Sequence, residues 1–277
     1  MKENAIAMLE TRMKNSLFCC GLDPDLSKMP VEKGFKDDER TEKFLKTVID
    51  STSDYVCAYK LQKAFFDKLP QGHNVLKDTI SYIHSKGGGI PAIVDCKIGD
   101  IDNTMQAYLD NIFGELNADG IVVNPYMGDD VMKPMSQYPN KAIVVLAKTS
   151  NPNGGIVQDV KLENGTLLWQ YVLGLITERW NSVGNMIPVI SSTASLDLET
   201  VREVIPDNMP ILLAGVGAQG GSYDDVSKLL NSKKSGVFVN SSRGIIYAKA
   251  ENGQTWQNAV EQAAINLRDA LNKERNK

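Results

Sequence analysis

The sequence predicts a single (β/α)8 barrel, and three observations indicate this fold. Eight short apolar runs recur along the 277 residues, segments of helical periodicity separate most of them, and polar residues follow the ends of the runs. Near-continuous apolar runs are typical of parallel strands that are covered on both faces. Eight alternating units in a chain of this length favour a closed barrel over the alternative, a doubly wound open sheet. We expect one domain over residues 1–277.

The expected elements follow one another in a regular order. The strands are expected at 17–22, 55–60, 90–94, 120–124, 142–146, 187–191, 211–215 and 236–240, with helices such as 100–113 and 223–230 between them. Two long polar connections interrupt this order, at 24–43 and 149–168. A connection of that length inside a compact domain is usually functional or disordered. The tail from Leu267 is expected to be a charged helix with a frayed end.

Composition and charge exclude several classes of protein. A net charge of −4 argues against a nucleic-acid binder, which normally carries a basic bias. No apolar run approaches the roughly 20 residues that span a bilayer, and the N-terminus lacks the apolar core of a signal peptide. The four cysteines match no zinc spacing, so we expect buried free thiols and a cytoplasmic location. His73 and His84 lie in a helix-like stretch, which disfavours histidine catalysis or a multi-histidine metal site.

The segment 90–104 carries the strongest chemical signal. Its apolar start leads into Asp95, Lys97 and Asp100. Side chains on a strand alternate between faces, so Asp95 and Lys97 should point the same way. Two carboxylates beside one ammonium keep the lysine charged, and the lysine can deliver a proton to a carbon centre. The alternative is a salt-bridged strand end followed by a helix start, because structural ion pairs also gather at such places.

Further polar residues follow the other expected strands. Active sites of such barrels lie at the carboxyl ends of the strands. Asp23 follows the first strand, Lys60 ends the second with Gln62 beyond it, and Thr149 and Ser150 follow the fifth. Taken alone, Asp23 fits a turn and Lys60 a solvated strand end. Together with the charges of segment 90–104 they would form a charged ring, whose desolvation costs several kcal/mol without a functional return.

The last two expected strands end in segments suited to phosphate. Residues 215–221 are rich in glycine, which allows close backbone approach and offers N–H donors. Ser241, Ser242, Arg243 and Gly244 follow the eighth strand, and an arginine can grip phosphate through two parallel hydrogen bonds. The loops after strands seven and eight are the usual phosphate site of this fold. The alternatives are a plain tight turn and a structural arginine at a helix start.

The string from Asp95 to Thr104 resembles the signature of the orotidine 5'-phosphate decarboxylases. Other segments occur in the order of that family, namely 21–25, 59–62, 149–152, 217–220 and 240–244. The length and the insertion at 149–168 resemble the longer subgroup. The resemblance implies conversion of orotidine 5'-monophosphate to uridine 5'-monophosphate and CO₂, without a cofactor or metal, and with no nucleic-acid or membrane partner.

The resemblance also implies a role for individual residues. Lys97 would protonate C6 of the pyrimidine, Asp95 would lie near the substrate carboxylate, and Lys60 would join the ribose to the charged ring. The remaining assignments concern the substrate and the partner subunit. Asp23 would bind ribose, Ser150 or its neighbour Thr149 the pyrimidine, and Gln219, Gly220, Ser242 and Arg243 the phosphate, with Gln62 where some relatives carry asparagine. Asp100, Ile101 and Thr104 would reach the site of the partner subunit in a homodimer.

Two other functions compete with this interpretation. Related barrels share the Asp-x-Lys-x-x-Asp pattern but act on sugar phosphates with magnesium, such as 3-keto-L-gulonate 6-phosphate decarboxylase. They would need a further acidic ligand where Lys60 stands. The second is a catalytically inactive nucleotide-binding protein. Binding alone does not require Lys97 between two carboxylates.

Overall fold

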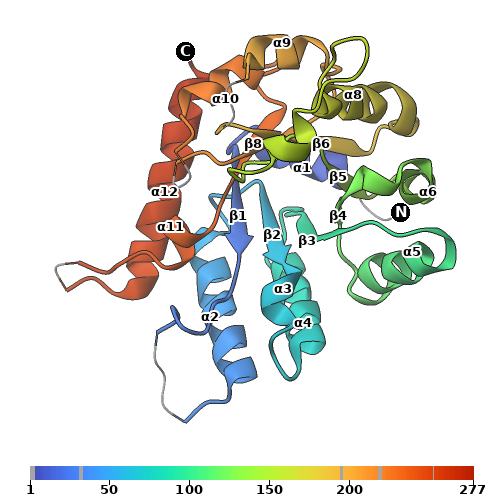
Figure 1. The fold of residues 1–277 in the computed structure, drawn as a ribbon. Coiled ribbons are helices and arrows are strands. Elements are labelled where there is room, and N and C mark those ends of the chain that lie inside the picture. The colour runs from blue at the N-terminus through green and yellow to red at the C-terminus, as the bar shows by residue number, and fades with distance from the viewer. Residues whose placement is uncertain (1–3, 31–33, 194–195, 218–219, 252) are drawn as a thin grey trace.

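The chain forms a closed barrel of eight parallel strands in chain order (Figure 1). The computed structural model describes residues 4–30, 34–193, 196–217, 220–251 and 253–277. Pairing of Phe18 with Val239 joins the first strand to the last, which confirms the predicted barrel and excludes the open sheet. The strands are β1 Phe18–Leu22, β2 Ala58–Gln62, β3 Ala92–Ile98, β4 Gly120–Val123, β5 Ala142–Leu146, β6 Met186–Ser191, β7 Ile211–Ala214 and β8 Val237–Ser241.

Two strands lie later in the chain than their apolar runs suggest. The chain before β2 is still in a turn, because the Tyr55 amide donates to the carbonyl of Thr52. β2 continues to Gln62, and β3 continues through Asp95 and Lys97 to Ile98. Strand pairing uses the backbone, so a polar side chain does not end a ladder. The functional side chains of β2 and β3 therefore stand on the barrel strands themselves.

Helices surround the barrel and complete the described structure. The α-helices are α1 Ala5–Met13, α2 Asp37–Thr52, α3 Lys63–Phe66, α4 Gly72–Ser85, α5 Asp102–Leu109, α6 Asp129–Met132, α7 Gly155–Gln158, α8 Leu168–Gly174, α9 Leu198–Glu203, α10 Asp224–Leu229, α11 Arg243–Ile246 and α12 Trp256–Arg275. Single-turn π- and 3₁₀-helices are η1 Asp110–Glu115, η2 Pro125–Met127, η3 Lys133–Gln137 and η4 Leu175–Trp180.

Three predictions about local structure need correction. The expected helix 100–113 divides into α5 and the π-turn η1. The polar stretch 24–43 includes the start of α2, whose first turn carries three acidic residues that suit the positive end of the helix dipole. The tail is not frayed, because α12 runs to Arg275 and buries Leu271 completely.

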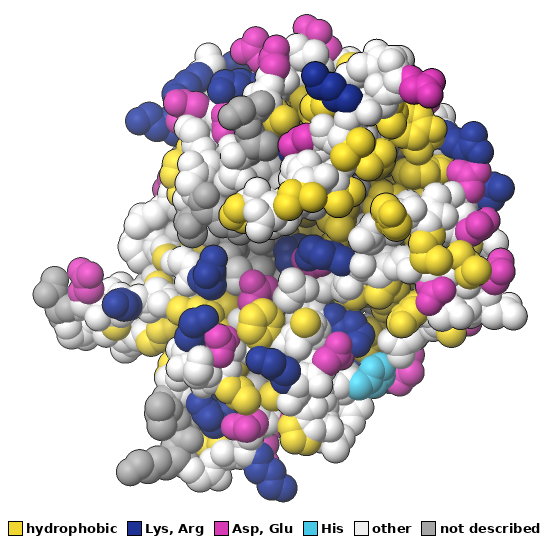
Figure 2. All heavy atoms as spheres, viewed as in Figure 1, with side chains coloured by type: hydrophobic (Ala, Val, Ile, Leu, Met, Phe, Trp, Pro, Cys, Tyr) yellow, Lys and Arg dark blue, Asp and Glu magenta, His cyan; other side chains and the backbone are white. Residues whose placement is uncertain are grey.

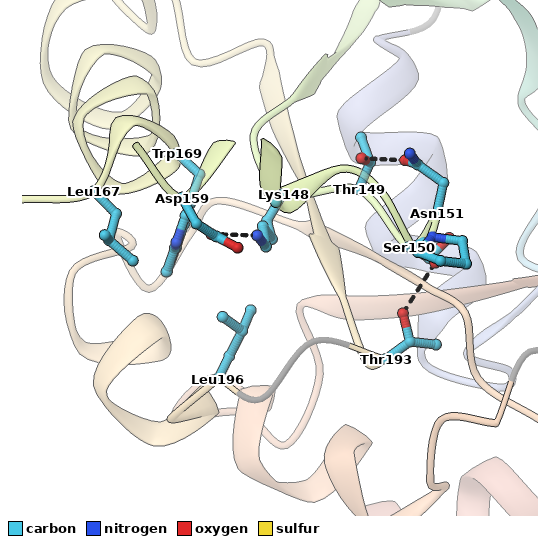
Figure 3. Close-up of a pocket in the computed structure, with 11 residues that line it drawn as sticks. Lys148, Thr149, Ser150, Asn151, Asp159, Leu167, Trp169, Thr193 and Leu196 are labelled. Atoms are coloured by element: carbon cyan, nitrogen blue, oxygen red, sulfur yellow. Dashed lines mark hydrogen bonds and ion pairs between the residues drawn. The ribbon is translucent and has the colours of Figure 1, made fainter. Parts of the chain in front are cut away.

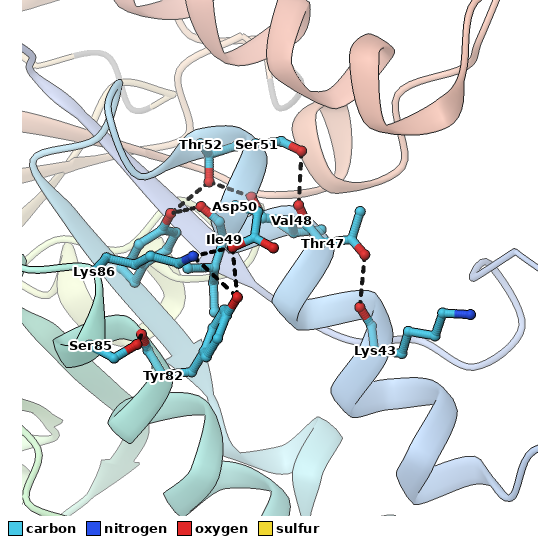
Figure 4. A network of polar contacts seen from close by, with 11 residues as sticks. Lys43, Thr47, Val48, Ile49, Asp50, Ser51, Thr52, Tyr82, Ser85 and Lys86 are labelled. Carbon is cyan, nitrogen blue, oxygen red and sulfur yellow. Dashed lines mark hydrogen bonds and ion pairs between the residues drawn. The ribbon is translucent and has the colours of Figure 1, made fainter.

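Polar contacts join α2 to α4 and to β2 of the barrel (Figure 4). Asp50 on α2 accepts a hydrogen bond from the Tyr82 hydroxyl at 2.7 Å and forms an ion pair with Lys86. The Thr52 hydroxyl lies 2.7 Å from the hydroxyl of Tyr59, which is fully buried on β2. A buried hydroxyl needs such a partner, so these contacts hold β2 in the position from which Lys60 projects.

The predicted placement is confirmed for both histidines and for three of the four cysteines. Cys19, Cys20 and Cys57 are buried and Cys96 is half-buried. Both histidines lie on α4, where His73 contacts Glu115 at 2.9 Å and His84 contacts Asp119 at 2.8 Å. Among the described residues, no helix is both long and apolar enough to cross a bilayer.

Candidate active site

A charged cluster lies at the carboxyl ends of β2 and β3. One carboxylate oxygen of Asp95 lies 2.7 Å from Lys60 Nζ, and the other lies 2.7 Å from Lys97 Nζ. The Lys60 and Asp95 side chains are buried, whereas the side chain of Lys97 is 45% exposed. Figure 2 shows a hollow in this face of the molecule with basic and acidic side chains at its floor. Lys97 is thus the cation of the cluster that a substrate in the barrel mouth can reach.

Lys97 reaches Asp95 through an irregular backbone. The ladder between β3 and β4 shifts register between Asp95 and Ile98, and Lys97 has φ +47°. Regular alternation, on which the sequence prediction rested, does not hold across this bulge. A non-glycine residue in the left-handed region is uncommon, and bulges near active sites re-aim side chains. The two side chains do meet, but the bulge brings them together.

Electrostatics keep the buried pair ionised. Burial alone would raise the pKa of Asp95, but the charges of Lys60 and Lys97 and their hydrogen bonds outweigh it, and this pKa falls below its ordinary value. Burial would likewise lower the pKa of Lys60, but the charges of Asp95 and Asp23 raise it above its ordinary value. The buried carboxylate of Asp95 and the buried ammonium of Lys60 therefore stabilise each other's charge.

Asp23 faces a second part of the same opening. It lines a cavity of about 340 Å³ whose wall also includes Gly215, Ser242, Arg243 and Tyr247. Among the described residues, Asp23 Oδ1 and Ser242 Oγ are buried without a hydrogen-bond partner. Buried polar atoms normally have partners, so both atoms mark places where a polar ligand would complete the bonding.

The loops after β7 and β8 border this cavity in different ways. Arg243 begins α11 and is exposed, and its side chain makes no ion pair within the described ranges. The amides of Gly217, Gly220 and Gly221 bond to carbonyls of their own loop at 2.8 to 3.0 Å. These three N–H groups are therefore used inside the turn and are not available to a ligand. The prediction that this glycine-rich loop offers N–H donors is wrong for them. Gln219 lies outside the described residues.

A larger cavity of about 570 Å³ lies beyond β5 (Figure 3). Thr149 and Ser150 line it, together with Lys148, Asp159, Trp169 and Thr193. The Thr149 hydroxyl donates to Asn151 at 2.6 Å and accepts from Gln158 at 2.7 Å. Ser150 accepts a hydrogen bond from Thr193 at its carbonyl, and in the described part of the chain its hydroxyl has no partner. Of the two adjacent hydroxyls, that of Ser150 is the one available to a ligand.

Comparison with known proteins assigns this arrangement to one family. The sequence profile of the orotidine 5'-phosphate decarboxylase / HUMPS family matches residues 16–259. A curated orotidine 5'-phosphate decarboxylase from Dechloromonas aromatica is 38% identical over 259 residues, covering 93% of this chain and 94% of its own. The chain belongs to this family.

Other relatives agree with that assignment. An orotidine 5'-phosphate decarboxylase of Aromatoleum aromaticum is 36% identical over 95% of this chain and 96% of its own. The structure of Leishmania donovani OMP decarboxylase superposes with a TM-score of 0.85 and 31% identity over 99% of this chain and 100% of its own. The predicted resemblance to the longer subgroup of the family is confirmed.

The side chains at residues 100–104, which belong to the family pattern, are not part of the charged cluster of their own chain. Asp100 is half-buried, and its carboxylate accepts a hydrogen bond from the Ile101 amide at 2.8 Å. Within the described ranges it forms no ion pair with Lys97. Ile101 and Thr104 are exposed at the start of α5. One protomer alone therefore presents these side chains outward, while Gln62 ends β2 directly beside Asp95 in the ladder.

The sequence patterns gave no role to Tyr247, Phe65 and Lys28, which line the cavity next to Asp23 together with Asn240. The Tyr247 hydroxyl donates to the Asp23 carbonyl at 2.7 Å and accepts from the Asp25 amide at 2.6 Å. Nothing in the local pattern around Tyr247 predicts a contact with a residue 224 positions earlier. The polar end of β8, which contains Asn240, was the one signal that could have pointed to this wall.

Within the described ranges, no cluster of side chains is suited to bind a metal ion. No group of three or more His, Cys, Asp or Glu side chains there is placed to hold an ion. The position on β2 where a magnesium-dependent relative would need an acidic ligand holds Lys60, which is paired with Asp95.

Proposed function

We propose that this chain decarboxylates orotidine 5'-monophosphate to uridine 5'-monophosphate and CO₂, the last step of de novo UMP synthesis. The observation that supports this most directly is the buried Asp95 carboxylate held between Lys60 and Lys97. An accessible ammonium fixed beside a buried carboxylate suits a reaction in which negative charge develops on carbon and is then protonated. We also propose a cytoplasmic location, where thiols such as Cys19 stay reduced.

The proposed chemistry needs no cofactor. The bond between C6 and the carboxylate carbon breaks, CO₂ leaves, and the electron pair remains on C6. The ammonium of Lys97 stabilises this carbanion and then transfers its proton to C6. Asp95 lies next to the departing carboxylate and orients Lys97 through their 2.7 Å contact. Lys60 holds the other oxygen of Asp95, and its raised pKa keeps it charged during this step.

The rest of the substrate extends from this cluster into the two cavities. We propose that the unpartnered Asp23 oxygen binds the ribose and that Lys60 also contacts a ribose hydroxyl. Ser150 would contact the pyrimidine, since Thr149 uses its hydroxyl within its own loop. Arg243 and Ser242 would bind the phosphate with Gln219, and Gln62 would border the substrate beside Asp95. Phosphate binding far from C6 can contribute to stabilising the transition state.

We further propose that two copies of the chain form a homodimer. Asp100, Ile101 and Thr104 would then complete the site of the partner. The exposed apolar side chains of Ile101, Tyr108, Tyr126 and Met127 support this proposal, since they follow the neighbouring strands β3 and β4. Exposed apolar residues that gather in one region mark interaction surfaces.

The direct test is turnover of orotidine 5'-monophosphate in a buffer with a chelator. We expect the orotate absorbance to fall in the wild type, and Lys97→Ala to lose turnover while it still binds uridine 5'-monophosphate. Retention of near-wild-type turnover in Lys97→Ala would refute the proton-donor role. A wild type that leaves the substrate unchanged, with and without added magnesium, would refute the proposed function.

A further inference from the structure

The insertion after β5 is fastened to the barrel rim at two consecutive residues. Gln158 accepts a hydrogen bond from the Thr149 amide at 3.1 Å and donates one to the Thr149 hydroxyl at 2.7 Å. Its neighbour Asp159 forms an ion pair with Lys148, whose side chain is almost fully buried. Figure 3 shows Asp159 directed toward Lys148 on the wall of the cavity. The end of α7 thus contacts the two residues that precede Ser150.

Two glycines allow α7 to come this close. A Cβ atom at Gly154 would lie 3.0 Å from the Thr149 hydroxyl and 3.2 Å from Gln158 Oε1. At Gly155 it would lie 2.5 Å from a carboxylate oxygen of Asp159. A Cβ atom at either position would therefore press on the groups that make the attachment, and the absence of a side chain at Gly154 and Gly155 leaves room for this contact.

Apolar packing contributes little to holding α7 in place. Ile156 is 76% exposed, and Val157 and Val160 are each about half exposed. A segment with few buried apolar contacts opens easily unless polar contacts hold it. The hydrogen bonds of Gln158 and the ion pair of Asp159 are therefore the side-chain contacts that hold α7 against the loop of Thr149 and Ser150.

We propose that Gln158 is a positioning residue for recognition of the pyrimidine. This inference deepens the proposed function and rests on it. Gln158 occupies both the amide and the hydroxyl of Thr149, which fixes the loop and leaves the Ser150 hydroxyl to face the base. Thr193 holds the Ser150 carbonyl from the other side at 3.1 Å. The insertion acts on the substrate through Thr149 and Ser150 without touching it.

The test compares a ligand that has the base with one that lacks it. Gln158→Ala should weaken uridine 5'-monophosphate about tenfold, the effect of losing roughly one hydrogen bond, and leave the affinity for ribose 5-phosphate unchanged. Hydrogen exchange at the Thr149 amide should accelerate in the same variant. Gln158→Asn keeps the amide group but shortens its reach, so it should behave like Gln158→Ala. Ile156→Ala, on the same helix, should match the wild type in all three measurements.

The outcomes separate this inference from the proposed function. Wild-type affinity for uridine 5'-monophosphate and unchanged Thr149 exchange in both Gln158 variants would overturn the positioning role. Equal weakening of both ligands would also overturn it, because a general structural effect does not distinguish the base. Turnover of orotidine 5'-monophosphate by the wild type is measured separately, so its failure refutes the proposed function and not the contact of Gln158 with Thr149.

Discussion

At the scale of single residues, the charged cluster is stable because each buried charge contacts an opposite charge, which offsets the cost of its burial. Asp95 and Lys60 are nearly inaccessible to solvent, and burial alone would lower the pKa of Lys60 and raise that of Asp95. Lys97 adds a second cation without being buried itself. Taking away the central carboxylate would leave Lys60 buried without the anion that contacts it, a change that is far more costly than loss of an exposed ion pair.

We therefore expect Asp95→Asn to lower the free energy of unfolding by about 3 kcal/mol at neutral pH. The pKa of Asp95 is lowered in the folded protein, so its contribution to stability is complete above the ordinary value of 3.8 and is lost as the pH falls through the lower, folded value. The difference from the wild type should be constant from about pH 8 to about pH 5 and should shrink below about pH 4. Denaturant titrations across this range measure it.

An exposed ion pair on α3 provides the matched control. Asp67 lies 2.6 Å from Lys63, and its side chain is 56% exposed. Asp67→Asn should change the free energy of unfolding by less than about 1 kcal/mol. Similar losses in the two variants would contradict the assignment of the cost to the buried Lys60.

At the scale of elements, the short helix α11 is tied to the connection after β1. Tyr247 follows α11 and bonds to the backbone of both Asp23 and Asp25. Its ring stacks on Phe44 of α2 at 5.5 Å, and Phe44 stacks in turn on Trp256 of α12 at 5.0 Å. The segment proposed to bind phosphate and the residue proposed to bind ribose are thus set at a fixed separation by one side chain.

Tyr247→Phe should lower the free energy of unfolding by about 1 to 2 kcal/mol, because it leaves a backbone carbonyl and an amide without their partner. The ring stack remains, so the loss isolates the hydroxyl. Tyr223→Phe is the control, since Tyr223 is 40% exposed and lies outside the proposed dimer surface, and its substitution should have an effect within about 0.5 kcal/mol. Denaturant titrations of both variants measure the effect. No loss in Tyr247→Phe would contradict the role of its hydroxyl.

At the scale of the whole molecule, the apolar surface is uneven. Figure 2 shows hydrophobic side chains gathered over the region of α6 and α8. Tyr126 and Met127 follow β4, while Ile101 and Tyr108 follow β3. The same segments carry the side chains of residues 100–104 that one protomer turns away from its own cluster. One association between two copies would cover the apolar side chains after β3 and β4 and supply the missing residues, as the homodimer proposal requires.

Met127→Glu should therefore convert a dimer into a monomer of 30.4 kDa and abolish turnover. A carboxylate placed in an apolar interface would be desolvated without a partner. Analytical ultracentrifugation together with the turnover assay measures both effects. Val204→Glu is the control, because Val204 is 57% exposed beside α9, away from the segments that follow β3 and β4. The proposal fails if Met127→Glu remains dimeric or if the wild type is active as a monomer.

Local patterns in the sequence are enough to predict the barrel, the order of its strands and the set of polar residues at their carboxyl ends. Continuous apolar runs report burial on both faces, and the ends of parallel strands gather at one end of a barrel, so local patterns are sufficient for these features. The family signature around Lys97 was likewise readable, because it lies within a dozen neighbouring residues.

The pairing of those polar residues depends on the closed fold and could not be predicted from the sequence. The bulge at Lys97, the use of the Thr149 hydroxyl by Gln158, and the contact of Tyr247 with Asp23 have no counterpart in a local pattern. Each depends on where a closed barrel places side chains that are distant in the chain, or on a backbone conformation that neighbouring strands impose. The hydrophobic periodicity of the sequence indicates whether a residue is buried. The identity of its hydrogen-bond partner is determined only when the barrel has closed.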